Sequence, residues 1–337
     1  MKFLPDQVVA RLQTELQTPD LSGTRYRALK FLGQGGMAIV WLAEDSILRR
    51  PVALKILSAE KSSADLPARL MQEAVILARL EHPGIVPVHD AGTLPDGCTF
   101  YCMKHVEGQT LDHYIGRLGL RQRLQLLQRI AEPLAFAHSR GIIHRDLKPA
   151  NIMVGSFGEV LIMDWGLARV IENSAAAQQN PAASDEGGPP TAERSPAFSP
   201  GLYTTVHGTV LGTPGFMAPE QERGDVNATD QRTDVFAFGA ILNYILRDNT
   251  TSSDRERGPR SLHAICRKAM SSEMAGRYST VQELSADLGK YLDNLPVSAY
   301  RENIVERAAR LIARHRVAVV LVLAYLFMRV LFVLFSR

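Results

Sequence analysis

A short polar stretch in the middle of the chain constrains the fold more than any other feature. It reads His-Arg-Asp-Leu-Lys-Pro-Ala-Asn over residues 144–151, and Asp-Trp-Gly follows at residues 164–166. Asp146 can accept a proton from a hydroxyl group, and Lys148 can neutralise charge on a transferred phosphoryl group. Asn151 and Asp164 offer the oxygen ligands that Mg²⁺ prefers. This spacing therefore predicts neighbouring loops that converge on a magnesium-bound phosphate.

Two upstream features are compatible with a bound polyphosphate. Residues 33–40, Gly-Gln-Gly-Gly-Met-Ala-Ile-Val, lie between two strand-like runs. Glycines there let backbone amides approach phosphates closely, although a hairpin turn alone would also explain them. Lys55 ends an apolar run, and a buried lysine needs an anion unless its side chain extends to solvent. Glu73 follows on a predicted helix, where it suits either an ion pair with Lys55 or a surface pair.

Hydrophobic periodicity separates a strand-rich first part from a mainly helical second part. The apolar spacing predicts strands within residues 26–57 and at residues 86–89 and 99–103. It predicts helices at residues 68–80, 121–138, 235–246, 261–270 and 281–292. Cys98, Cys102 and Cys266 form no metal-ligand spacing, which indicates free thiols in a reducing compartment.

These motifs together resemble those of the eukaryotic-type (Hanks-type) serine/threonine protein kinases of bacteria. The resemblance covers about residues 26–292 and implies an α+β, bilobal fold. The domain boundaries that it implies are an N-terminal extension at residues 1–25 and a kinase domain at residues 26–295, with a β-rich lobe at 26–107 and a helical lobe at 108–295. It also implies ATP and Mg²⁺ as cofactors and transfer of the γ-phosphoryl group to a protein Ser or Thr.

The resemblance gives each motif residue a role. Asp146 and Lys148 would be catalytic, and Asn151 and Asp164 would hold the metal. Lys55 would contact the α- and β-phosphates while pairing with Glu73. The backbone at residues 104–106 would receive adenine, with Met103 at the back of the pocket. The implied nucleotide-binding residues are Gly33, Gln34, Gly35, Gly36, Val40, Ala53, Lys55, Glu73, Met103, Lys104 and Val106.

A second group of residues resembles the end of a kinase activation segment. Residues 212–220 read Gly-Thr-Pro-Gly-Phe-Met-Ala-Pro-Glu. The resemblance implies that Asp234 braces the catalytic loop and that Arg277 pairs with Glu220. Lys148 together with Thr213 favours Ser or Thr over Tyr as the acceptor.

Departures from the kinase pattern leave other functions open. Ala38 stands at the third glycine position, Trp165 replaces the usual Phe, and residues 247–262 are short and polar. These departures motivate an alternative, a pseudokinase that acts as a membrane scaffold. A kinase for small molecules such as aminoglycosides is a third possibility, which Thr213 and the segment ending at Glu220 disfavour because they resemble a platform for peptides.

Residues 173–200 differ in composition from the rest of the chain. Ala, Pro, Ser and Gly make up 18 of these 28 residues, which predicts a disordered insert in the activation segment. Thr204, Thr205 and Thr209 follow this insert and are candidate phosphorylation sites. A phosphate there would pair with Arg145 and order the segment.

Residues 317–335 are apolar or aromatic at 18 of 19 positions, with Arg329 the exception. A helix of this length spans about 28 Å, which predicts a transmembrane helix rather than a buried one. The preceding segment, residues 296–316, is basic and carries the excess charge of the chain, so the kinase domain is expected on the cytoplasmic side of the inner membrane. Membrane lipid and self-association are the further expected partners. No broad basic surface indicates nucleic-acid binding.

Overall fold

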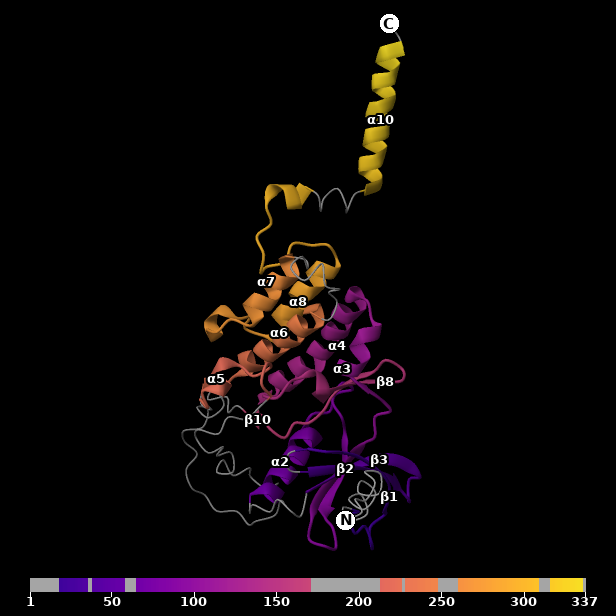
Figure 1. Cartoon of the computed structure of the whole chain (residues 1–337), viewed down its shortest axis with the longest axis vertical. Helices are drawn as coiled ribbons and strands as arrows, with labels where there is room; N and C mark the ends of the chain where they lie inside the picture. Colours follow the sequence, from indigo (N-terminus) through magenta and orange to yellow (C-terminus); the bar gives the residue numbers. More distant parts are fainter. Residues whose placement is uncertain are drawn as a thin grey trace, which may run out of the picture.

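The strand-rich first part of the chain forms one antiparallel sheet in the order β1-β2-β3-β5-β4. The computed structural model describes residues 18–35, 38–57, 65–170, 213–225, 228–247, 260–308 and 316–335. The five strands are β1 (Tyr26–Gln34), β2 (Ala38–Asp45), β3 (Arg50–Leu57), β4 (Val88–Thr93) and β5 (Thr99–Lys104). The sheet and the helix α2 make up one lobe, and a helical lobe follows it (Figure 1).

The alternation of side chains between the two faces of β3 determines the direction of Lys55. Val52, Leu54 and Ile56 are buried in a cluster on one face of the sheet. Successive side chains of a strand point to opposite faces, so Ala53 and Lys55 lie on the other face, which looks toward α2 and the helical lobe.

The helix α2 (Leu66–Arg79) packs against β4 and β5 through one apolar stripe. Leu70, Ala74 and Leu77 lie on this stripe and are buried. Glu73 shares the stripe because residues three and four apart lie on the same helix face. Packing of the stripe therefore carries a carboxylate into the lobe interior, where Glu73 is only 4% exposed.

The second lobe is built on helices that pack around α4 and α6. Its helices are α3 (Leu111–Tyr114), α4 (Leu120–Ser139), α5 (Pro219–Glu222), α6 (Gln231–Arg247), α7 (Arg260–Ala269) and α8 (Val281–Leu292). Its short strands are β6 (Gly108–Thr110), β7 (Ile142–Ile143), β8 (Ile152–Gly155), β9 (Val160–Ile162) and β10 (Arg169–Val170). The catalytic-loop motif lies between β7 and β8, on the side of this lobe that faces the sheet (Figure 1).

Most predicted elements are confirmed within a few residues, but one strand is displaced. The strand predicted at residues 86–89 begins at Val88 and continues to Thr93. Val86 instead donates its N–H to the carbonyl of Ile162 in the other lobe, at 3.4 Å. Pro87 has no N–H to continue a ladder, so strand pairing with β5 starts only after it. The predicted free state of the three cysteines is confirmed.

A buried carboxylate fixes the chain after α8 to the helical lobe. The Asp287 side chain is 1% exposed and accepts hydrogen bonds from the Ser298 hydroxyl at 2.6 Å and the Ser298 N–H at 2.9 Å. Ala299 N–H and the Tyr278 hydroxyl donate to the same group. Burial alone would raise the pKa of Asp287, but the hydrogen bonds from Ser298 outweigh it and lower the pKa to about 2.

Replacing Asp287 by asparagine is expected to destabilise the fold by about 2 kcal/mol at pH 7. The folded pKa lies below the ordinary value of 3.8, so the carboxylate stabilises the fold above about pH 4 and loses this contribution as the pH falls toward 2. Urea unfolding at pH 7 and at pH 3 measures both effects, and the difference between the two proteins should shrink at pH 3. The control is Asp293→Asn, at an exposed position at the end of the same helix. Equal stability of Asp287→Asn and wild type at pH 7 would contradict this role.

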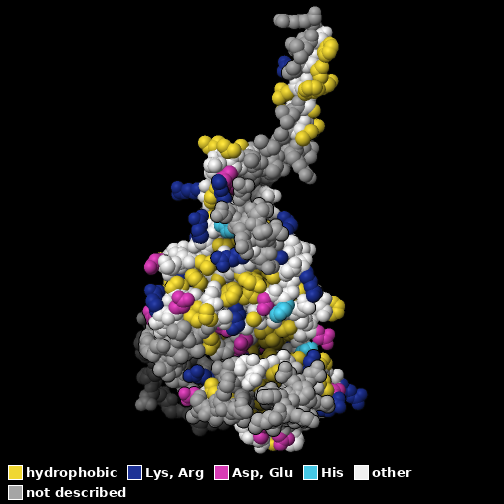
Figure 2. Space-filling model, viewed as in Figure 1, with side chains coloured by type: hydrophobic (Ala, Val, Ile, Leu, Met, Phe, Trp, Pro, Cys, Tyr) yellow, Lys and Arg dark blue, Asp and Glu magenta, His cyan; other side chains and the backbone are white. Residues whose placement is uncertain are grey.

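The helix α10 (Arg316–Phe335) stands apart from the two lobes (Figure 1). Apolar side chains are exposed along it, among them Leu321, Phe327 and Met328 (Figure 2). Within the described ranges, no helix has both the length and the apolar character that crossing a membrane requires. The predicted transmembrane helix at residues 317–335 is therefore not supported.

Several predictions fall outside the described residues. They concern the insert at residues 173–200, the three candidate phosphorylation sites Thr204, Thr205 and Thr209, most of the polar stretch at 247–262, and Gly36 of the glycine-rich segment.

Candidate active site

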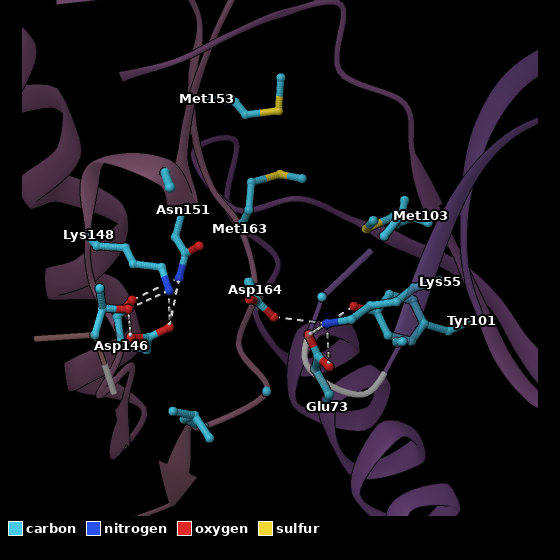
Figure 3. Close-up of a pocket in the computed structure, with 17 residues that line it drawn as sticks. Lys55, Glu73, Tyr101, Met103, Asp146, Lys148, Asn151, Met153, Met163 and Asp164 are labelled. Carbon is cyan, nitrogen blue, oxygen red and sulfur yellow. Dashed lines mark hydrogen bonds and ion pairs between the residues drawn. The ribbon is translucent and has the colours of Figure 1, made fainter. Parts of the chain in front are cut away.

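A cavity of about 490 Å³ lies between the two lobes. The sheet lobe contributes Gly35, Ala38, Val40, Lys55, Glu73, Tyr101 and Met103, and the helical lobe contributes Asp146, Lys148, Ala150, Asn151, Met153, Met163, Asp164, Gly166, Leu167 and Thr213. Two hydrogen-bonded groups of charged residues face this cavity, one around Lys55 and one around Asp146 (Figure 3). All of the predicted catalytic and metal-binding residues are therefore brought to one place.

The first group joins the two lobes through Lys55. Its Nζ lies 2.8 Å and 2.9 Å from the two carboxylate oxygens of Glu73 and 2.9 Å from Oδ1 of Asp164 (Figure 3). Burial alone would lower the pKa of Lys55, but the negative charges of Glu73 and Asp164 outweigh it and raise the pKa. Burial would raise the pKa of Asp164, yet the charge of Lys55 keeps it below its ordinary value. Lys55 and Asp164 are therefore both charged at neutral pH.

Tyr101 is a functional residue that the sequence reasoning missed. Its hydroxyl donates to Oε1 of Glu73 at 2.9 Å, and its side chain is 1% exposed. Burial, followed by the negative charge of Glu73, raises the pKa of Tyr101 well above 10, so the phenol stays protonated and acts as the donor. Tyr101 lies two residues before Met103 on β5, and only the three-dimensional packing of α2 on β5 brings it to Glu73.

Replacing Tyr101 by phenylalanine is expected to raise KM for ATP about fivefold, which corresponds to about 1 kcal/mol. The change removes one donor from a buried carboxylate and loosens the orientation of the Lys55–Glu73 pair. Steady-state kinetics at varied ATP concentration measures this effect. Tyr300→Phe is a matched control, because the Tyr300 hydroxyl also donates to a glutamate, Glu306, but far along the chain from the cavity. An unchanged KM in Tyr101→Phe would show that Lys55 alone orients Glu73.

The second group is centred on the carboxylate of Asp146. Lys148 Nζ lies 2.8 Å from Oδ2 of Asp146 and 2.6 Å from Oγ1 of Thr213. Thr213 in turn donates to Oδ1 of Asp146 at 3.1 Å, and Asn151 Nδ2 donates to Oδ2 at 3.2 Å. Each oxygen of this carboxylate is therefore held in place beside the cavity. A carboxylate oriented in this way can accept a proton from a hydroxyl group that enters the cavity.

The catalytic loop that carries Asp146 is braced from α6. Asp234 is fully buried, and its carboxylate accepts the N–H of His144 at 2.8 Å and the N–H of Arg145 at 2.9 Å. His138 Nε2 lies 2.7 Å from the same carboxylate. Arg145 has a φ of 66°, a left-handed conformation that costs a non-glycine residue about 1–3 kcal/mol. The predicted bracing role of Asp234 agrees with this geometry, which places Asp146 directly after a strained residue.

The residues present fit a magnesium ion that is shared with a nucleotide. Asn151 donates through its Nδ2 to the carbonyl of Asp146 at 2.8 Å, which leaves its Oδ1 available to a cation. Asp164 uses Oδ1 for Lys55, and its side chain remains 49% exposed. No group of three or more His, Cys, Asp or Glu side chains suited to a metal occurs among the described residues. Mg²⁺ usually binds one or two protein carboxylates and completes its shell with phosphate oxygens and water, so this small donor set fits it.

Part of the glycine-rich segment lines the cavity. Of the residues predicted to bind nucleotide here, Gly35 and Val40 line the cavity, while Gly33 and Gln34 lie on β1 outside the cavity lining. Ala38 begins β2, is 2% exposed, and is absent from the positive-φ residues of the described ranges. Alanine therefore meets no backbone strain at this glycine position.

One part of the cavity lining consists of methionine side chains. Met103 lines the cavity as predicted, together with Met153 and Met163, which the sequence reasoning missed (Figure 3). The other predicted contacts, Ala53, Lys104 and Val106, do not appear in the cavity lining. Ala53 and Val106 are buried in the core next to Met103, and the Lys104 side chain is exposed.

Trp165 fills the interior behind the loop that carries Asp164. It is fully buried, its ring lies 4.7 Å from the ring of His144, and its Nε1 donates to the carbonyl of Ile162 at 3.5 Å. The indole therefore packs against the catalytic loop and leaves Asp164 facing the cavity. This departure from the kinase pattern removes no group from the site.

The predicted pair of Glu220 and Arg277 forms in the helical lobe. Two parallel hydrogen bonds of 2.7 Å join the guanidinium to the carboxylate, and the two side chains are 0% and 3% exposed. Thr233 donates to Glu220 at 2.9 Å. A bidentate pair of this kind fixes one end of residues 213–220 to the helical lobe, while Thr213 at the other end contacts Asp146 of the catalytic loop.

Comparison with known proteins agrees with this geometry. Residues 26–296 match the family described as "Protein kinase domain". The serine/threonine-protein kinase PknD of Protochlamydia amoebophila is 31% identical over 80% of this chain and 30% of its own length. The probable serine/threonine-protein kinase PknB of Bifidobacterium longum is 31% identical over 83% of this chain and 41% of its own length.

A solved structure shows the same fold. The PknI kinase domain of Mycobacterium tuberculosis superposes with a TM-score of 0.55 at 21% identity, over 79% of this chain and 96% of that domain. The chain spans only 30% and 41% of the lengths of PknD and PknB, the two curated relatives named above. The family match, the bilobal fold and the geometry of the cavity agree, and the chain belongs to the protein kinase family.

Proposed function

We propose that the protein transfers the γ-phosphoryl group of ATP to Ser or Thr hydroxyls of other proteins. The observation that carries this proposal is the convergence of the Lys55–Glu73–Asp164 group and the Asp146–Lys148–Thr213 group on one cavity. The first group suits binding of a polyphosphate, and the second suits activation of an incoming hydroxyl.

The described side chains divide the reaction between them. Asp146 accepts the proton of the acceptor hydroxyl, and Lys148 donates to the transferring phosphoryl oxygens as they gain charge. Lys55 orients the α- and β-phosphates, while Asn151 and Asp164 would hold Mg²⁺. When bound, this ion neutralises phosphate oxygens. Positioning and electrostatics therefore account for most of the expected rate enhancement.

The test is phosphotransfer by the purified full-length protein in detergent. Mg²⁺, radiolabelled ATP and a generic basic protein should give labelled phosphoserine or phosphothreonine. Small alcohols offered in place of the protein should remain unlabelled. Nucleotide binding without any transfer would instead favour the scaffold alternative. At present neither the geometry at Ala38 nor that at Trp165 supports the alternative, since both leave the site intact.

We also propose regulation by phosphorylation of the activation segment. This proposal is supported by Arg145, whose Nε is buried without a hydrogen-bond partner among the described residues. Burial and then the positive charge of Arg169 lower the pKa of Arg145, so an anion beside the two arginines would be favoured. Mass spectrometry of active protein tests this, and absence of phosphate from residues 201–213 would contradict it. Self-association is the proposed route by which one copy phosphorylates another.

Attachment to the inner membrane remains a proposal that rests on the sequence of residues 317–335 and on the exposed apolar side chains of α10. The cytoplasmic position of the kinase domain rests likewise on the arginines of residues 301–316. Cell fractionation with carbonate washing tests the attachment to the membrane. The full chain should stay with the membranes, and a chain that ends at residue 316 should be released. Release of the full chain by carbonate would contradict the proposal.

A further inference from the structure

Gln221 joins the end of the activation segment to the catalytic loop. Its side chain is 5% exposed and lies in α5, directly after Glu220. Its Oε1 accepts the N–H of Ala218 at 3.2 Å, and its Nε2 donates to the carbonyl oxygen of Arg145 at 2.7 Å. The first contact is local, whereas the second bridges 76 positions of the chain.

Both contacts depend on the amide group and fix its orientation. With the amide turned over, its oxygen would face the Arg145 carbonyl and its NH₂ would face the Ala218 N–H. Either encounter would leave a buried polar group without a partner. Only a side chain that accepts at one end and donates at the other satisfies both neighbours.

The acceptor of the long-range bond is a residue with a strained backbone. Arg145 adopts the left-handed φ of 66° and precedes Asp146 directly. Its N–H is held by Asp234 at 2.9 Å, and its carbonyl is held by Gln221. The peptide group that links Arg145 to Asp146 is therefore held through its oxygen by Gln221. Loss of the Gln221 side chain would therefore allow the backbone of Asp146, the proposed proton acceptor, to shift.

We infer that Gln221 is a positioning residue, which couples the docked end of the activation segment to the placement of Asp146. This inference rests on the proposed phosphotransfer. Gln221 itself lies outside the cavity lining, and no nucleotide contact is assigned to it. Its loss should therefore lower kcat and leave nucleotide affinity unchanged.

Two substitutions test the long-range contact, and the first of them keeps the local one. Gln221→Glu keeps an oxygen for the Ala218 N–H but, as a carboxylate, cannot donate to Arg145. Gln221→Met has similar length and cannot donate at any pH, which covers the case of a protonated glutamic acid. Gln231→Glu is the matched control, because Gln231 Nε2 also donates to a backbone carbonyl, that of Ser279 at 2.9 Å, away from the catalytic loop.

The measurements are kcat, affinity for ATP by fluorescence titration, and melting temperature, all with full-length protein at pH 8.5. Small displacements of a reacting group cost up to about 10²-fold in rate, so we expect kcat to fall at least about tenfold in Gln221→Met and Gln221→Glu. ATP affinity should stay within about twofold in both, and Gln231→Glu should match wild type.

Three results would overturn the inference. They are wild-type kcat in Gln221→Met, full kcat in Gln221→Glu at pH 8.5, or a loss of ATP affinity as large as the loss of kcat. If one variant does not unfold cooperatively, the other decides by the same criteria. Inactive wild-type protein would refute the proposed function, whereas active wild type with equally active Gln221 variants would refute only the role of Gln221.

Discussion

Replacing Asp146 by asparagine is expected to lower kcat by about 10²- to 10⁴-fold, the range typical of losing a general base. Asparagine has nearly the same shape and keeps an oxygen for Thr213, but it cannot take a proton from the acceptor hydroxyl. Affinity for ATP should remain within a few-fold, because Lys55 and Asp164 are unchanged. Single-turnover phosphorylation measures the chemical step, and fluorescence titration measures the affinity.

The split between rate and affinity makes this result diagnostic. Asp146 accepts hydrogen bonds from Lys148, Thr213 and Asn151, so a bulkier change would disturb all three. Asp293→Asn, at an exposed position of the helical lobe, controls for a general effect of losing a carboxylate. Wild-type rates in Asp146→Asn would remove Asp146 from the mechanism and would leave the cavity with no identified proton acceptor among its lining residues.

Replacing Asp164 by alanine is expected to reduce turnover of Mg-ATP by about 10³-fold. Loss of metal-assisted charge neutralisation costs several kcal/mol, and about 4 kcal/mol corresponds to this factor. The variant also removes the 2.9 Å partner of Lys55, although the Lys55–Glu73 pair remains. Turnover should be measured over a range of Mg²⁺ concentrations.

Metal dependence distinguishes this loss from a general defect. In wild type, Mg²⁺ should strengthen ATP binding relative to binding in the presence of EDTA. In Asp164→Ala that strengthening should disappear, while binding in EDTA persists. Full Mg-dependent turnover in the variant would show that Asn151 alone holds the ion, and it would overturn the assignment of Asp164.

The sequence allowed prediction of those parts of the site that lie within continuous motifs. Asp146, Lys148 and Asn151 share one loop, and that loop faces the cavity as expected. The pairing of Lys55 with Glu73 was left open by the residues alone and came from the resemblance to kinases; strand alternation and helix periodicity explain why both side chains point inward. Helix boundaries were also close, because long apolar stripes are strong signals.

Residues that act across long separations and belong to no recognised motif could not be found in this way. Tyr101 reaches Glu73 over 28 positions, and Gln221 reaches Arg145 over 76. Neither contact has a local pattern, because each depends on how separate elements pack. The short strands β7, β8 and β9 were missed for a related reason, since strands of two to four residues carry too little periodicity to detect.

The buried carboxylate of Asp287 has a practical consequence for where the folded domain can be cut. Its donors include Ser298 and Ala299, and Val297 is itself only 5% exposed. A recombinant fragment that stops at residue 296 would match the family boundary yet remove these donors. An interior anion would then lack most of its hydrogen bonds. Fragments intended for crystallisation or inhibitor screening should therefore extend at least to residue 300.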